Sequence, residues 1–279
     1  MALGIAPCGS EIYFTVSLIQ CVSKIKTLHP YAALVVDGKW NFKRHKCIVV
    51  SDLHIGFESE LYFKGITLNL NLIVDEMVND IIDIIKTYKA DSVIILGDLK
   101  NTVGSINKEE WQNVPRFFKL ISQFAKVYMV PGNHDSNIRF LAPSNITMIS
   151  TSGLTLDDTL FIHGHSMPFQ VGSTIKRIVM GHIHPIFIKT GSTINGQRVW
   201  IYLKVKMEAI WPLTEGILDI IVVPSFNKHL FAMTQRAYRK SVSPLISRVF
   251  KYNAIESARV ITLDGSIIGD TDTIRSIFF

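Results

Sequence analysis

The chain has 279 residues, of which 48% are hydrophobic and 19% are charged. This composition is typical of a folded α/β protein and excludes a disordered chain. No apolar run reaches the roughly 18 residues of a membrane span, so we expect no membrane partner. Cys8, Cys21 and Cys47 lack a regular spacing, which favours free thiols and a cytoplasmic location. The formal net charge is +6, and residues 226–260 account for it, with seven basic side chains against one acidic.

The first half of the chain alternates expected strands and helices. Asp37-Gly38 lies between two apolar runs and favours a tight turn in a hairpin over 32–42. Apolar side chains at three- and four-residue spacing predict a helix over 67–90. A second helix follows, with one apolar face formed by Trp111, Val114, Phe117, Phe118, Ile121 and Phe124. Short apolar runs predict buried strands at 47–50, 92–96 and 127–130.

Each of these three strands leads into a polar loop. Asp52 and His54 follow the first strand, and Asp98 follows the second. Asn133 and His134 follow the third. Right-handed crossovers through the helices would make the strands parallel and bring their carboxyl ends to one edge of the sheet. Since ligand sites of open α/β sheets form at that edge, we expect the polar loops to share one site.

The second half shows few long helical patterns and predicts a second, more antiparallel sheet packed on the first. A hairpin over 154–162 ends before His163, and a strand at 177–180 ends before His182 and His184. Residues 1–31 form an N-terminal extension without an assigned role. Residues 32–279 form a single domain, because no linker or repeat divides them. Further strands are expected at 185–189, 199–204, 218–223, 260–263 and 266–268.

The polar residues at the strand ends are of the metal-binding type. Besides His134 they provide two carboxylates, one amide, four imidazoles and no sulfur. Such ligands suit Mn²⁺ best, with Fe, Zn or Ni as alternatives, and suit Ca²⁺ or Mg²⁺ less well. Because their number exceeds the need of one tetrahedral ion, we expect two divalent transition-metal ions that share a carboxylate. The candidate ligands are Asp52, His54, Asp98, Asn133, His163, His182 and His184.

Charge counting then predicts the class of substrate. Two divalent ions bring four positive charges, and the carboxylates of Asp52 and Asp98 offset only two of them. The site would therefore hold an anionic phosphoester, and a hydroxide bridging the two ions would attack it. His134 lies beside a ligand but is not needed as one, so it would protonate the leaving oxygen or stabilise the charge of the transition state. We expect Arg139 and His165 to contact the substrate.

Five sequence blocks, in this order, resemble those of the calcineurin-like metallophosphoesterase superfamily: Asp52-Leu53-His54, Gly97-Asp98, Gly132-Asn133-His134-Asp135, His163 and Gly181-His182-Ile183-His184. The resemblance runs from about residue 32 to the end. It implies a four-layer α/β/β/α sandwich of two mixed sheets, with His134 as the catalytic histidine. It assigns one ion to Asp52, His54, Asp98 and His184, and the other to Asp98, Asn133, His163 and His182. His165 stays an alternative to His163, which is favoured because it directly follows its strand.

Three segments are also similar to archaeal phosphoesterases related to the bacterial DNA-ligase-associated group: 51–58, 96–100, and 222–227 followed by Ser243-Pro244-Leu245. This similarity implies a phosphodiesterase or nuclease. The basic segment 226–260 would then contact nucleic acid, although a solvated surface is the alternative interpretation. A small-molecule phosphomonoesterase or a cyclic-nucleotide phosphodiesterase fits the lack of a large capping domain. Outside enzymes, the alternative is a metal-binding scaffold without turnover in a nucleic-acid-processing complex.

Overall fold

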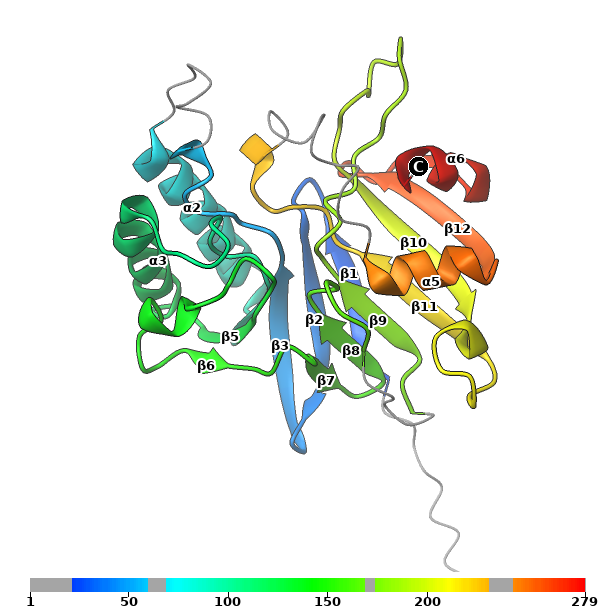
Figure 1. Cartoon of the computed structure of the whole chain (residues 1–279). Helices are drawn as coiled ribbons and strands as arrows, with labels where there is room; N and C mark the ends of the chain where they lie inside the picture. Colours follow the sequence, from blue (N-terminus) through cyan, green and yellow to red (C-terminus); the bar gives the residue numbers. More distant parts are fainter. Residues whose placement is uncertain (1–21, 60–68, 169–173, 231–242, 279) are drawn as a thin grey trace, which may run out of the picture.

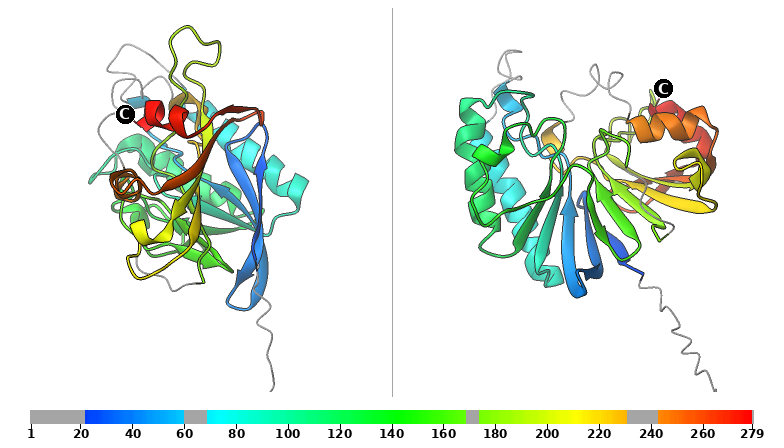
Figure 2. Two further views of the ribbon diagram at one scale, coloured as in Figure 1. Left: turned by 90° about the vertical axis from the view of Figure 1, so that its right-hand side faces the viewer. Right: turned by 60° about the horizontal axis from the view of Figure 1, so that its bottom comes forward.

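Two β-sheets pack face to face, and each carries helices on its outer side (Figures 1 and 2). The computed structural model describes residues 22–59, 69–168, 174–230 and 243–278. The first sheet has six strands in chain order, and its pairing is antiparallel from β1 to β3 and parallel from β3 to β6. These strands are β1 Lys24–Leu28, β2 Ala33–Trp40, β3 Lys43–Val50, β4 Ser92–Leu96, β5 Lys126–Val130 and β6 Thr147–Met148.

Two helices cover the outer face of the first sheet. They are α2 (Leu70–Tyr88) and α3 (Lys108–Ile121), and their apolar sides share one core with the strands. The side chain of Asn69 caps α2 by accepting a hydrogen bond from Leu72 N–H. Both predicted helices and the parallel order of β3, β4 and β5 are therefore confirmed within the described residues.

The apolar face predicted for α3 is wrong at its two ends. Trp111 is 52% exposed and Phe124 is 43% exposed. Trp111 lies in the first turn, where the helix buries Glu110 and not an apolar side chain. Phe124 lies beyond the last residue of the helix. Only Val114, Phe117, Phe118 and Ile121 of the predicted face are buried.

The second sheet has seven strands in the order β13-β12-β10-β11-β9-β8-β7. β9 pairs in parallel with β8 and β11, and the remaining pairs are antiparallel, so this sheet is also mixed. The strands are β7 Leu154–Leu156, β8 Thr159–Ile162, β9 Arg177–Met180, β10 Val199–Lys206, β11 Ile217–Val222, β12 Ile255–Thr262 and β13 Ile267–Gly269. The strand predicted at 185–189 does not form. Pro185 has no N–H for a ladder, and only an isolated bridge joins Ile186 to Arg198.

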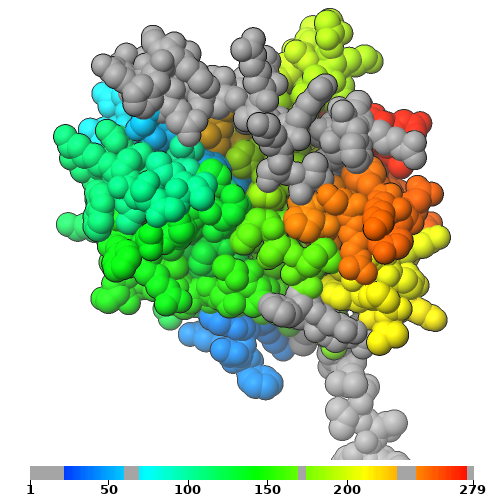
Figure 3. All heavy atoms as spheres, viewed as in Figure 1, coloured from blue at the N-terminus to red at the C-terminus, as the bar shows by residue number. Residues whose placement is uncertain are grey.

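Two short helices, α5 (Pro244–Lys251) and α6 (Thr271–Phe278), cover the outer face of the second sheet. The sequence analysis did not predict them, because eight residues offer too few turns for a clear apolar period. A third apolar cluster, which includes Leu34, Phe161 and Trp200, fills the space between the sheets. The predicted four-layer α/β/β/α sandwich is therefore confirmed. In the space-filling view, α3 (green) lies on the left side of the molecule and α5 (orange) on the right (Figure 3).

The first sheet begins before the predicted domain boundary at residue 32. β1 pairs with β2 over five residues, from Lys24↔Asp37 to Leu28↔Ala33. Residues 1–21 lie outside the described residues. Among the described helices, none combines the length and hydrophobicity needed to cross a bilayer.

Candidate metal centre

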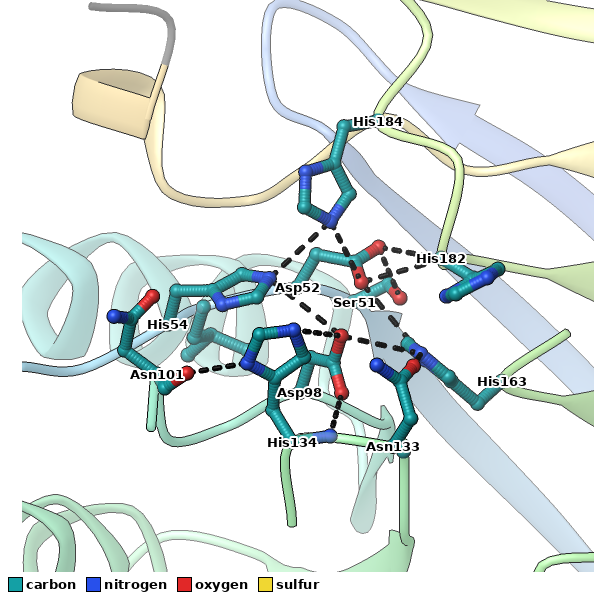
Figure 4. A network of polar contacts seen from close by, with 12 residues as sticks. Ser51, Asp52, His54, Asp98, Asn101, Asn133, His134, His163, His182 and His184 are labelled. Atoms are coloured by element: carbon teal, nitrogen blue, oxygen red, sulfur yellow. Dashed lines mark hydrogen bonds and ion pairs between the residues drawn. The ribbon is translucent and has the colours of Figure 1, made fainter. Parts of the chain in front are cut away.

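The polar loops come together where strands of both sheets end (Figure 4). β3 and β4 lead into the loops of Asp52 and Asp98, and β5 leads into the loop of Asn133. β8 and β9 of the second sheet lead into those of His163 and His182. Figure 4 shows the labelled imidazoles gathered around the carboxylates of Asp52 and Asp98. The convergence expected from the sequence is present.

Asp52, His54, Asp98 and His184 form the first group of donors. His184 Nε2 lies 3.1 Å from Asp52 Oδ1, and His54 Nε2 lies 3.6 Å from Asp98 Oδ2. The two Nε2 atoms lie 3.2 Å apart. One donor atom from each of the four residues lies within 4.8 Å of all the others, which is close enough for one ion to bind them together.

Asp98, His163 and His182 form the second group, again within 4.8 Å of one another. His163 Nε2 lies 3.3 Å from Asp98 Oδ2 and 3.2 Å from the side-chain oxygen of Asn133. Asn133 thus adds an amide oxygen to this group. Asp98 belongs to both groups, as a carboxylate that bridges two ions must.

The backbone at these residues is strained. Asp52, His54, Asp98, His182 and His184 all have a positive φ, at 57°, 46°, 51°, 73° and 48°. A left-handed conformation costs an L-residue about 1 kcal/mol or more, and such strain collects at functional sites. Five of the eleven non-glycine residues with a positive φ in the described part of the chain are thus candidate ligands, so the site concentrates a backbone conformation that L-residues disfavour.

Glycines allow the loops to approach one another. A methyl group on Gly132 would clash with the carboxylate of Asp98, and one on Gly181 would clash with Ser51 and Asp52. The glycines in these two motifs are therefore needed for packing between loops.

Over residues 45–199 the chain matches the family model described as calcineurin-like phosphoesterase. The chain belongs to the calcineurin-like phosphoesterase family. The matched region contains all of the candidate ligands of this phosphoesterase, and the two donor groups that share Asp98 are its candidates for the family's two metal ions. No curated protein matches the sequence significantly.

Two solved structures align with most of the chain. The nuclease MPE from Pseudomonas putida aligns with a TM-score of 0.49 and 14% identity, over 84% of this chain and 100% of that one. Yfce, a phosphoesterase from E. coli, aligns with a TM-score of 0.38 and 15% identity, over 81% of this chain and 97% of that one.

Two of the four candidate imidazoles are already in the neutral state that cation binding requires. Burial lowers the pKa of His54 to about 3 and that of His182 to about 4, so both rings are neutral at pH 7 and offer a lone pair. Burial would also lower the pKa of His163, but the carboxylates of Asp98 and Asp52 outweigh it and raise the pKa to about 9. In the site without metal, a proton on His163 thus partly balances the negative charge of the two buried carboxylates. Bound metal ions would balance that charge in its place. The donor set fits a pair of divalent ions.

The structure distinguishes the two candidate histidines after β8. The ring of His163 is fully buried, and its Nδ1 donates a hydrogen bond to the carbonyl of Leu96 at 2.8 Å. Its Nε2 therefore faces Asp98 and is the nitrogen that could bind a metal ion. His165 belongs to neither donor group, and its ring centroid lies 5.3 Å from that of His163. Arg139 is exposed on the short helix η1 (Ile138–Phe140) and belongs to neither donor group.

His134 stands beside the donors in a different setting. Its Nδ1 donates to the carbonyl oxygen of Asn101, and its backbone N–H donates to Asp98 Oδ1 at 2.9 Å. Its Nε2 lies 4.0 Å from Asp98 Oδ2. The imidazole is therefore oriented by the protein, with one nitrogen turned toward the carboxylate that both groups share.

Asp135 has a structural role that the sequence analysis did not predict. Its buried carboxylate accepts hydrogen bonds from the N–H groups of Asp98, Leu99, Lys100 and Gly132, at 2.7, 3.0, 3.3 and 2.7 Å. It thereby ties the loop after β4 to the loop after β5. Its position directly after Asn133 and His134 is the sequence feature that could have indicated this role.

The described basic residues of segment 226–260 lie on three separate elements. Lys228, in η3 (Lys228–Leu230), pairs with Glu76. Arg248 donates from α5 to the carbonyl of Ala209 at 2.6 Å, and Arg259 lies on β12. Arg236, Arg239 and Lys240 lie outside the described residues. Contact with nucleic acid through this segment stays a prediction.

Glu58 ends the first polar loop with an unusual carboxylate. It is only 6% exposed, and neither oxygen has a hydrogen-bond partner among the described residues. Burial, with a smaller effect of the charge on Glu109, raises its pKa from 4.5 to about 7. Because the folded protein prefers the protonated acid, its contribution to stability is complete below about pH 4.5 and is lost as the pH rises through about 7.

We therefore expect Glu58→Gln to stabilise the metal-free protein above pH 7 by roughly 3 kcal/mol relative to wild type, with little difference near pH 4.5. Urea unfolding at several pH values, with chelator present, measures this difference. Glu215→Gln, at an exposed position, is the control. Equal effects of Glu58→Gln at both ends of the pH range would contradict the prediction.

Proposed function

We propose that the chain is a dinuclear metal-dependent phosphodiesterase that cleaves nucleic acid. The observation that carries the proposal is the pair of donor groups that share Asp98, with His134 oriented beside them. One ion would bind Asp52, His54, Asp98 and His184, and the other Asp98, Asn133, His163 and His182. Imidazole, carboxylate and amide donors without sulfur favour Mn²⁺.

Different residues of the site would have different roles in hydrolysis. Bound divalent ions supply Lewis acidity, lower the pKa of a water molecule and offset the charge of a phosphoester. Asp98 holds the two donor groups together, and the neutral rings of His54 and His182 offer lone pairs at pH 7. Because Nδ1 of His134 donates to the Asn101 carbonyl, Nε2 is the nitrogen that can exchange a proton with the leaving oxygen.

Two features of the sequence support a nucleic acid as the substrate. The basic segment 226–260 would attract a polyanion, and segments 51–58, 96–100 and 222–227 are similar to the archaeal group related to DNA-ligase-associated phosphoesterases. We include membership of that group in the proposal. Cys47 is a free buried thiol, and it fits the cytoplasmic location that we also propose.

A substrate panel in Mn²⁺ tests the proposal. It contains aryl monoesters and diesters, cyclic nucleotides, and single- and double-stranded DNA and RNA. We expect cleavage of aryl diesters and of polynucleotides, with the His134→Ala protein as background. The cleavage of polynucleotides should fall as the salt concentration rises. Cleavage confined to monoesters would favour the phosphomonoesterase alternative. Two bound ions without turnover on any substrate would favour the scaffold.

A further inference from the structure

Residues 100–105 form the loop that orients His134. The carbonyl oxygen of Asn101 accepts the hydrogen bond from His134 Nδ1. A carbonyl can only accept, so this contact selects the tautomer that carries its proton on Nδ1 and leaves Nε2 free. The position of one backbone carbonyl therefore decides both the tautomer and the direction of the ring.

A buried carboxylate outside the metal centre holds that carbonyl in place. Glu110 is fully buried, and its Oε1 accepts from the N–H groups of Asn101 at 2.9 Å and Thr102 at 2.6 Å. Its Oε2 accepts from Thr102 Oγ1 at 2.6 Å. Gly56 makes room for it, because a methyl group there would lie 2.8 Å from Glu110 Cγ. The loop thus depends on Glu110 for the N–H of Thr102, and Glu110 shares the N–H of Asn101 with the carbonyl of Ile55 at 3.1 Å.

The same carboxylate caps α3. Glu110 Oε2 accepts from Asn107 N–H at 3.0 Å, and Glu110 N–H donates to Asn107 Oδ1 at 2.7 Å, which together form a capping box. A capping box needs only these two contacts. The two bonds from Oε1 to residues 101 and 102 are additional, and they point to a second role.

Lys100 holds the same loop independently. Its fully buried side chain donates from Nζ to the carbonyl of Thr102 and, at 3.0 Å, to that of Ser105. Neither Lys100 Nζ nor Glu110 contacts a donor group. The backbone of Asp98 is held instead by Asp135. Glu110 and Lys100 Nζ therefore act on residues 101–105, whereas Asp135 holds residues 98–100, and the N–H of Asn101 also donates to the carbonyl of Ile55 at 3.1 Å.

We propose that Glu110 is a positioning residue for His134, acting through the Asn101 carbonyl. This inference rests on the role of His134 in the proposed function. Without the carboxylate, the N–H of Thr102 loses its acceptor and the N–H of Asn101 loses one of its acceptors, so residues 101–102 shift and the His134 ring loses the contact that selects its tautomer. Turnover should fall while substrate and metal binding stay.

Three variants separate this role from helix capping. Glu110→Ala removes both sets of contacts, and Asn107→Ala removes only the side-chain half of the cap. Glu110→Gln keeps an oxygen that can accept from Asn101 and Thr102 but places an amide nitrogen against Asn107 N–H. We expect all three to lower Tm. Only Glu110→Ala should lower kcat, by about 10- to 100-fold, with KM and the Mn²⁺ dissociation constant within about threefold of wild type.

The tautomer of His134 gives a readout that does not depend on turnover. In ¹⁵N NMR spectra of the metal-free protein at mildly alkaline pH, wild type, Glu110→Gln and Asn107→Ala should show a protonated Nδ1 and a free Nε2. Glu110→Ala should show a mixture of tautomers. If Glu110→Ala does not fold, Lys100→Met loosens the same loop without touching the cap and should reproduce the loss of kcat and the mixed tautomer.

Several results would overturn the inference. They are wild-type kcat and tautomer in Glu110→Ala or in Lys100→Met, or an equal loss of kcat in Asn107→Ala and Glu110→Ala. His134→Ala belongs in the same series. If that variant keeps full turnover, the role of His134 in the proposed function fails, whereas the tautomer shift in Glu110→Ala still reports whether Glu110 positions the ring.

Discussion

Asp98→Ala is expected to lose both metal ions, because this carboxylate is the one residue that both donor groups share. Loss of supporting contacts around a metal ligand already weakens affinity by 10- to 100-fold, so loss of the shared ligand should weaken it by more than about 100-fold. Metal analysis of protein purified without chelator, with Mn²⁺ titration calorimetry, measures the effect. Hydrolysis should fall to that of chelator-treated wild type.

Asp219→Ala is the control for Asp98→Ala. It removes a carboxylate that pairs with Lys204 on the second sheet, away from both donor groups, and it should keep two ions per chain. An Asp98→Ala protein that still binds two ions would show that Asp98 does not bridge them. Retention of one ion would mean that one donor group holds metal without the shared carboxylate.

His134→Ala is expected to keep both ions and lose most of its turnover. Its Nε2 lies 4.0 Å from Asp98 Oδ2 and the residue belongs to neither donor group, so metal binding should stay within about threefold of wild type. Loss of a positioned acid–base group lowers kcat by about 10²- to 10⁴-fold. The measurement is kcat on an aryl phosphodiester in saturating Mn²⁺, with metal content determined on the same sample.

His229→Ala is the matched control for His134→Ala, since its ring pairs with Glu76 outside the donor groups. It should keep wild-type kcat. Full turnover in His134→Ala would remove this histidine from the mechanism. Loss of metal in His134→Ala would instead make it a ligand, contrary to the geometry.

The sequence by itself determined the candidate ligands and the order of the strands that carry them. Asp52, Asp98 and Asn133 each follow a short apolar run rich in β-branched residues, and such runs are typical of buried strands. Parallel pairing then aligns the strand ends, so the site could be inferred without coordinates. The helices α2 and α3 were predictable for the same reason, because they are long enough to show an apolar period.

Only the tertiary structure decided the features that depend on contacts between distant segments. The choice of His163 over His165 rests on the burial of one ring against the carbonyl of Leu96, 67 residues away. The edge strand β1 is defined by its pairing with β2, and α5 and α6 by the sheet that they cover. The left-handed backbone of five candidate ligands and the contacts by which Glu110 positions the Asn101 carbonyl likewise cannot be read from the sequence. A left-handed backbone runs against the local preference of L-residues, so a sequence pattern does not predict it. The role of Glu110 depends on contacts among three segments: the start of α3, the loop of residues 100–105, and His134.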